Sequence, residues 1–187
     1  PAASTLASWV EATPAGFVFA LKAPMRITHI MRLRNAGEAT EVFLRMIDPL
    51  RSARRLGPIL FQLPPQMRCD TDLLAAFLDI LPPDLRYAFE FRHTSWLTDA
   101  VYRLLEAKGA ALCVAESEKL EVPDVITADW TYYRLRKPDY TAEDVEAIAA
   151  RARRLMAEGR DVYLMFKHEE TPAGALHAER VLALAGQ

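Results

Sequence analysis

The sequence predicts an α/β fold, specifically a TIM-type parallel (β/α) barrel, and three observations support this prediction. Short β-rich runs alternate with longer amphipathic segments, polar residues gather at the carboxyl ends of the runs, and large and small side chains alternate within them. Repeated strand–helix units form a parallel sheet that is covered by helices. A doubly wound sheet fits the alternation too. The absence of a Gly-rich phosphate turn such as GxGxxG makes that alternative weaker.

Six runs have the composition of strands, and a weaker seventh run leads into the fifth of them. They lie at residues 16–22, 59–63, 86–92, 110–114, 130–135 (preceded by 125–127) and 161–167. Helices are expected between them, at residues 38–55, 70–81, 97–108, 141–159 and 173–185. Thr141 and Asp144 resemble a capping box, and Gly109 suits the end of a helix.

Alternation within the strands predicts which side chains point into the barrel. Ala88, Glu90 and Arg92 are expected to share the inner face, while Tyr87, Phe89 and Phe91 are expected to face the helices. A barrel of this type has about eight strands. Six runs fall short of that, and the chain begins at Pro1 within a helix-like segment. We therefore expect residues 1–187 to form a single barrel domain that lacks part of its beginning.

Composition places the chain among globular proteins and gives limited information about its partners. Hydrophobic residues make up 51% and charged residues 26%, and the formal net charge is −2. That charge gives no overall electrostatic case for nucleic acid, although a local basic site remains compatible with it. Cys69 and Cys113 form no CxxC pair, so we expect a reduced, cytoplasmic protein. The sequence contains no membrane-spanning stretch or signal-peptide pattern.

The candidate site lies at the carboxyl ends of the predicted strands, where barrel enzymes place their chemistry. The polar residues read off those ends are Lys22, Gln62, Glu90, Arg92, Asp129, Arg134 and Lys167, with His29, His93 and His168 just beyond them. Cations dominate this set, and paired guanidinium donors favour phosphate, sulfate or carboxylate ligands. We therefore expect Lys22, Gln62, Arg92, Arg134 and Lys167 to bind a small anionic substrate.

Three residues are candidates for catalysis: Glu90, Asp129 and His93. Glu90 and Arg92 share one strand face and can pair, which lowers the pKa of the carboxyl group and makes Glu90 a poor general acid. It could serve as a base or simply as a counter-ion. His93 follows a strand, where it could act in catalysis or cap the next helix. No metal-binding motif is visible, so neither a metal nor a cofactor is expected.

An ordered series of motifs resembles the YecE-like family (DUF-72), a domain of unknown function. The matching segments are FVFALK at 17–22 with ITH at 27–29, LGPILFQLPP at 56–65, AFEFRHTSW at 88–96, ALC at 111–113, YRLR at 133–136 and VYLMFKHE at 162–169. The resemblance implies a TIM-type barrel without an established activity. It also implies that the family's N-terminal part, two strand–helix units, is missing before Pro1. The ending of the last strand differs from the Asn-rich ending of some members.

Our leading hypothesis is an enzyme that acts on a small anionic or phosphorylated substrate by hydrolysis or isomerisation. The alternative is a non-catalytic module that binds an anionic metabolite or a nucleic acid through the same cations. A metal-dependent nuclease is a weaker reading, by fold analogy alone. The charged residues could also form a purely structural ion-pair network. We expect no membrane partner.

Overall fold

A computed structural model describes residues 3–137, 139–167 and 172–186, and its centre is one parallel sheet. The strands follow one another in chain order across the sheet. They are β1 (Phe19–Lys22), β2 (Leu56–Gln62), β3 (Tyr87–Glu90), β4 (Ala111–Ala115), β5 (Trp130–Leu135) and β6 (Asp161–Phe166). Every neighbouring pair is parallel, so all six carboxyl ends lie on one side of the sheet, as predicted.

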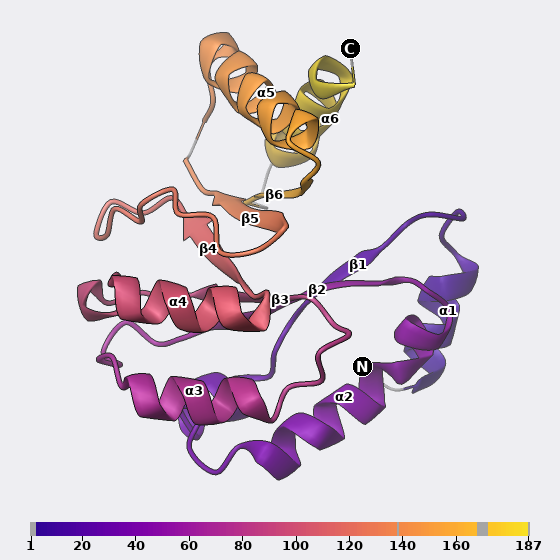
Figure 1. Ribbon diagram of the computed structural model, residues 1–187. Helices are drawn as coiled ribbons and strands as arrows, with labels where there is room; N and C mark the ends of the chain where they lie inside the picture. The colour runs from indigo at the N-terminus through magenta and orange to yellow at the C-terminus, as the bar shows by residue number, and fades with distance from the viewer. Residues whose placement is uncertain (1–2, 138, 168–171, 187) are drawn as a thin grey trace.

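Helices connect most of the strands and lie outside the curve of the sheet (Figure 1). The α-helices are α1 (Ala3–Glu11), α2 (Gly37–Ser52), α3 (Thr71–Asp79), α4 (Asp99–Lys108), α5 (Ala142–Ala157) and α6 (Ala173–Ala185). Two short turns of helix follow β1 and β3, a π-helix at Arg26–Ile30 and a 3₁₀ helix at Thr94–Trp96. Figure 1 shows α2, α3 and α4 along β1–β4, and α5 with α6 at the β5–β6 end.

The sequence signals at the helix ends are confirmed. Thr141 and Asp144 form the predicted capping box at the start of α5. Asp70 caps α3 by accepting a hydrogen bond from the backbone N–H of Leu73. Gly109 ends α4 with a φ of 65°, in the left-handed region that glycine enters without strain.

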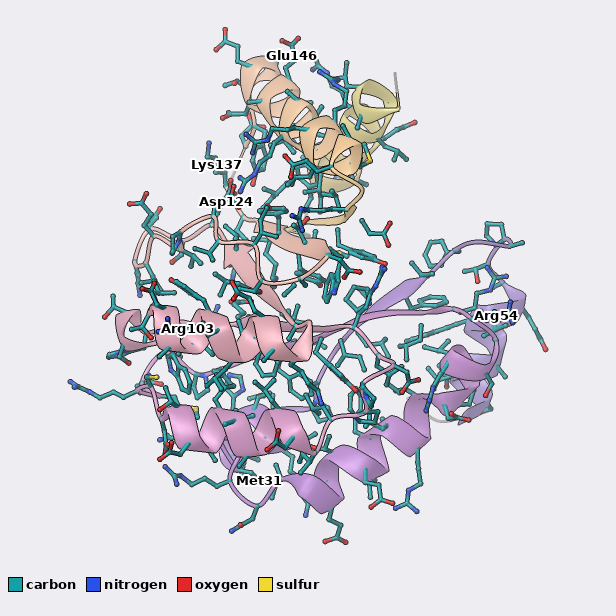
Figure 2. The ribbon with its side chains drawn as sticks, viewed as in Figure 1. Met31, Arg54, Arg103, Asp124, Lys137 and Glu146 are labelled. Atoms are coloured by element: carbon teal, nitrogen blue, oxygen red, sulfur yellow. The ribbon has the colours of Figure 1, made fainter. Side chains whose placement is uncertain are left out.

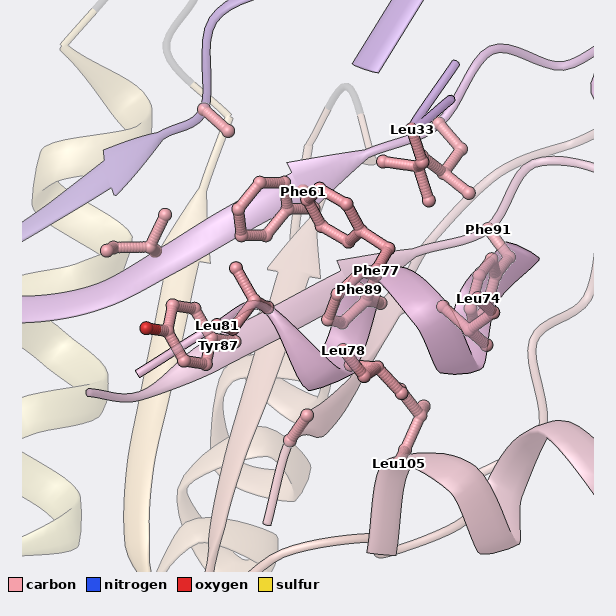
Figure 3. Close-up of a cluster of buried hydrophobic side chains, with 14 of the residues drawn as sticks. Leu33, Phe61, Leu74, Phe77, Leu78, Leu81, Tyr87, Phe89, Phe91 and Leu105 are labelled. Carbon is pink, nitrogen blue, oxygen red and sulfur yellow. The ribbon is translucent and has the colours of Figure 1, made fainter. Parts of the chain in front are cut away.

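The two faces of the sheet have different partners, as the alternation predicted. Tyr87, Phe89 and Phe91 belong to the main core between the sheet and the helices. Phe61 of β2 stacks on Phe89 at a centroid distance of 5.3 Å and meets Phe77 of α3 edge-on at 5.2 Å (Figure 3). On the other face, a second cluster fills the inside of the curve with Leu60, Ala88, Ala111, Cys113, Ala115, Trp130 and Tyr132.

The sheet is a half-barrel and not a closed barrel. Within the described residues, β1 pairs only with β2, and β6 pairs only with β5. The predicted barrel class is therefore confirmed in its parallel strands, its strand order and its inward and outward faces. A closed TIM barrel is not observed.

The connection from β4 to β5 has no helix, and the strand predicted at 125–127 is wrong. Residues 116–129 are irregular. The buried Thr127 hydroxyl donates to the carbonyl of Ala110 at 2.7 Å and accepts from the N–H of Leu112 at 2.9 Å. The Thr127 side chain thus makes the hydrogen bonds that a neighbouring strand would otherwise make at the start of β4. Asp124 ties the same connection to α5 through Arg151 and to β5 through the hydroxyl of Tyr133 (Figure 2).

Both cysteines are free thiols: Cys113 is buried within the half-barrel and Cys69 is half-buried. The cytoplasmic location expected from them stays a prediction. Among the described residues, no helix combines the length and hydropathy that crossing a membrane requires.

We predict that Thr127→Val lowers the free energy of unfolding by about 1–3 kcal/mol, because it leaves a buried N–H and a buried carbonyl without partners. Thr131→Val is the matched control. Thr131 is also buried, but its hydroxyl has no hydrogen-bond partner among the described residues, so its loss should be neutral or mildly stabilising. Urea denaturation of both variants measures the difference. Equal losses would contradict the role given to Thr127.

Candidate functional site

A buried carboxylate, Glu90, is the centre of the polar cluster at the carboxyl end of the sheet. Its side chain is 2% exposed. Gln62 donates from Nε2 to both carboxylate oxygens at 2.9 Å, and Arg92 donates from Nε to Oε1 at 3.0 Å. Arg134 donates from Nη1 to Oε2. Three donors from β2, β5 and the end of β3 therefore converge on one carboxylate.

The parallel register explains why Gln62 and Glu90 meet. The two residues are direct partners across β2 and β3, so their side chains leave the sheet on the same face. Lys22 at the end of β1 extends the chain of contacts, donating from Nζ to Gln62 Oε1 at 2.8 Å. The result is a row of polar side chains across three adjacent strands.

Arg134 reaches Glu90 from two strands away because β4 carries small side chains between them. Ala115 is the register partner of Arg134, and Cys113 lies two residues earlier on the same inner face. Neither side chain is long enough to fill the space above β4. The alternation of large and small residues thus decides which strands can share this site.

The electrostatics of Glu90 make it a permanent anion at neutral pH. Burial alone would raise the pKa of its carboxyl group, but the charge of Arg134, the Gln62 hydrogen bond and Arg92 outweigh burial and lower it. Both oxygens already accept hydrogen bonds. Of the two roles left open by the sequence, the geometry therefore favours counter-ion over base.

Cations exceed carboxylates around this centre within the part of the chain that the structure describes. Lys22, Arg92, Arg134 and Arg136 all act on one another or on Glu90 electrostatically. At the rim, Glu116 supplies a second carboxylate, but it accepts from the backbone N–H groups of Arg136 at 2.6 Å and Lys137 at 3.1 Å. Partial burial, with the charges of Arg134, Arg92 and Arg136, lowers the pKa of Lys22.

The two histidines that the structure describes near the strand ends have different surroundings. His93 accepts from the backbone N–H of Ser95 at Nδ1, 3.1 Å away, and so caps the short helix at Thr94–Trp96. His29 lies in the π-helix after β1, with Nδ1 2.8 Å from the hydroxyl of the buried Thr28. Partial burial and the charges of Lys22 and Arg92 lower the pKa of His29, which places it near the cluster.

Asp129, Lys167 and His168 were also predicted to lie at or just beyond carboxyl strand ends, and the outcome differs for each. The placement of Asp129 at a carboxyl strand end is wrong: it is exposed and directly precedes Trp130, the first residue of β5, at the opposite end of the sheet. The error follows from the false strand at 125–127. Lys167 does follow β6 and is exposed, with its backbone N–H bonded to Leu135. His168 lies outside the described residues.

A groove of about 680 Å³ has Arg136 in common with the cluster. It is lined by the end of β4, by residues 116–122 of the following connection, and by Arg136 and Lys137 after β5. This groove was not predictable from the sequence, because it depends on the irregular path of the connection. Within the described residues, no group of three or more His, Cys, Asp or Glu is placed to hold a metal ion.

A family model described as "Protein of unknown function DUF72" matches residues 1–187. The chain belongs to the DUF72 family. This confirms the resemblance drawn from the sequence motifs. The crystal structure of a DUF72 family protein from Thermotoga maritima MSB8 superposes with a TM-score of 0.87 at 23% identity, covering 100% of this chain and 80% of that one. A DUF72 family protein from Enterococcus faecalis V583 gives 0.84 at 17% identity, covering 100% and 85%.

Curated relatives extend the comparison without naming an activity. The UPF0759 protein YecE of Escherichia coli K12 is 34% identical over 94 residues, which cover 50% of this DUF72 chain and 34% of YecE. The chain thus aligns with about a third of that protein's length. The UPF0759 protein YunF of Bacillus subtilis 168 is 24% identical over 213 residues, covering 94% of this chain and 76% of YunF.

We predict that Glu90→Gln lowers the free energy of unfolding at pH 7 by about 3–5 kcal/mol, because it leaves two arginines without their buried counter-ion. The folded pKa of Glu90 is lowered, so its contribution is present above the unfolded glutamate pKa of about 4.3 and is lost as pH falls through the folded value. The difference between wild type and variant should therefore shrink in acid.

Glu106→Gln is the control for this experiment. Glu106 is exposed on α4 and should change stability little at any pH. Denaturant titrations from pH 7 down to pH 3 follow all three proteins. A Glu90→Gln variant as stable as wild type at pH 7 would refute the central role of this carboxylate.

Proposed function

We propose that the carboxyl end of the half-barrel binds the phosphate or carboxylate group of a small anionic substrate. The observation that carries the proposal is the surplus of cations around a carboxylate that is already saturated. Glu90 holds Arg92 and Arg134 in place but neutralises only one positive charge. Lys22 and Arg136 have no carboxylate within ion-pair distance among the described residues.

Arg92 is the strongest candidate for direct contact with the anion. It uses only Nε to reach Glu90, and within the described residues its two terminal nitrogens have no hydrogen-bond partner. Its side chain is 33% exposed, more than the 24% of Arg134. A guanidinium fixed by its Nε and open at its Nη atoms suits bidentate binding of an oxyanion. The groove beside Arg136 has room for the rest of the ligand.

Catalysis at this site would need a group that moves a proton, and His29 fits that role better than the residues chosen from the sequence. Glu90 is saturated with donors, and His93 caps a helix. His29 is half-buried and has a lowered pKa, so its ring is neutral near pH 7 and can accept a proton. The non-catalytic alternative keeps the same cations and needs no such group.

We predict that inorganic phosphate raises the melting temperature of the wild type by roughly 5–10 °C at about a hundred times its Kd. Arg92→Ala should lose most of this shift, and Arg92→Lys should keep only part, because the paired donors are gone. Phosphate also stabilises proteins non-specifically, so a control arginine is needed. Arg103→Ala serves, since Arg103 is exposed on the outer helix α4 (Figure 2).

The comparison between variants decides the result. A specific site gives equal phosphate shifts in wild type and Arg103→Ala and a reduced shift in Arg92→Ala. Equal shifts in all proteins would mean that the cluster is a structural ion-pair network, and the proposed function would fall.

A further inference from the structure

Lys22 has a setting unlike that of the other charged residues in the cluster. Its only described hydrogen-bond acceptor is the neutral Oε1 of Gln62, 2.8 Å from Nζ. Glu90 acts on Lys22 electrostatically, but its oxygens are occupied by hydrogen bonds from Gln62, Arg92 and Arg134. Among the residues that the structure describes, the amine therefore has no carboxylate within ion-pair distance.

Glu90 also fixes the acceptor that Lys22 meets. The amide of Gln62 can donate only from Nε2, and both Glu90 oxygens take that donor. The Oε1 atom is consequently turned towards Lys22. An amide oxygen accepts more strongly from an ammonium ion than from a neutral amine, but it can accept from both, so this contact is available to Nζ in either protonation state.

We propose that Lys22 is a nucleophile that forms an imine with the carbonyl carbon of a small oxo acid, whose acid group is bound by the neighbouring cations. The inference rests on the proposed anion site and goes beyond it by naming a reaction and a substrate class. Lys22 lies at the carboxyl end of β1, on the same side of the sheet as Arg92 and Arg134. It is exposed, so a substrate can reach it.

The step balances without a further reactant. The ammonium group of Lys22 first gives one proton to solvent or to His29. The neutral amine then adds to the carbonyl carbon and yields a carbinolamine. The carbinolamine oxygen takes up two protons in all, one from the nitrogen and one returned by solvent or His29, and leaves as water. The product is a protonated imine on Lys22 and one water molecule, with no change in oxidation state.

The charges around Lys22 favour the neutral amine that this reaction requires. Partial burial, Arg134, Arg92 and Arg136 all lower its pKa, and only Glu90 opposes them. Cationic neighbours and desolvation activate imine-forming lysines in the same way. Lys137 provides the contrast: its pKa is raised by its hydrogen bond to Asp144, and it is exposed.

The test is reductive trapping of the imine. The full chain is incubated at pH 7 with pyruvate and sodium cyanoborohydride, and peptide mapping by mass spectrometry measures the fraction modified at each lysine. Lys22 should be modified at least ten times faster than Lys137. Lys22→Arg should remove the fast modification while keeping the positive charge. Lys108→Arg, at the end of the outer helix α4, should leave the modification of Lys22 unchanged. Phosphate and Arg92→Ala should both slow it.

The outcomes separate this inference from the proposed function. Equal modification of Lys22 and Lys137 would overturn the inference, and an Arg92-dependent phosphate shift in melting temperature would still uphold the anion site. Fast modification of Lys22 that neither phosphate nor Arg92→Ala slows would overturn the choice of an oxo acid. Equal rates with pyruvate and neutral acetone would overturn it as well. Fast, phosphate-sensitive modification confined to Lys22 would support both.

Discussion

Glu90 carries a full negative charge inside a half-barrel, where an uncompensated ion would cost several kcal/mol. The arrangement of the surrounding polar groups follows from that cost. Gln62 turns its amide nitrogen inward, Arg134 crosses above β4, and Arg92 folds back onto its own strand. Each of these groups is positioned by the need to compensate one carboxylate. Our proposal assigns their remaining donors, together with Lys22, to the binding of a ligand.

The backbone makes this convergence feasible before any side chain is considered. Six parallel strands in chain order bring their carboxyl ends to one side, and the register places Gln62 beside Glu90. The outer face, with Phe61 and Phe89 packed on α3, anchors the strands that carry both polar residues. Rigid aromatic packing on one face therefore supports a charged layer on the other, which is how a barrel scaffold holds a precise site.

Sequence reasoning predicted the features that depend on local pattern. Alternation identified the inner and outer faces of β3, and the pairing of Glu90 with Arg92 followed from their spacing. It failed where tertiary contacts decide. The run at 125–127 has strand-like composition, yet Thr127 bonds the edge of β4 through its side chain. The sequence pattern also could not show that donors from three strands would occupy both oxygens of Glu90. That arrangement depends on the register of the strands.

The irregular connection between β4 and β5 has one part that is bonded to neighbouring elements and another part that lines the groove. Hydrogen bonds and ion pairs of Thr127 and Asp124 hold its end in place. Residues 117–121 line the groove, and among the described residues their one side-chain hydrogen bond is local, from the N–H of Lys119 to Ser117 Oγ. Doubling the length of a flexible loop costs only about 0.6 kcal/mol of closure entropy. Insertions there would reshape the groove while leaving the charged layer intact. If the carboxyl end of the sheet binds the ligand that we propose, such insertions would change which ligands fit without moving Glu90.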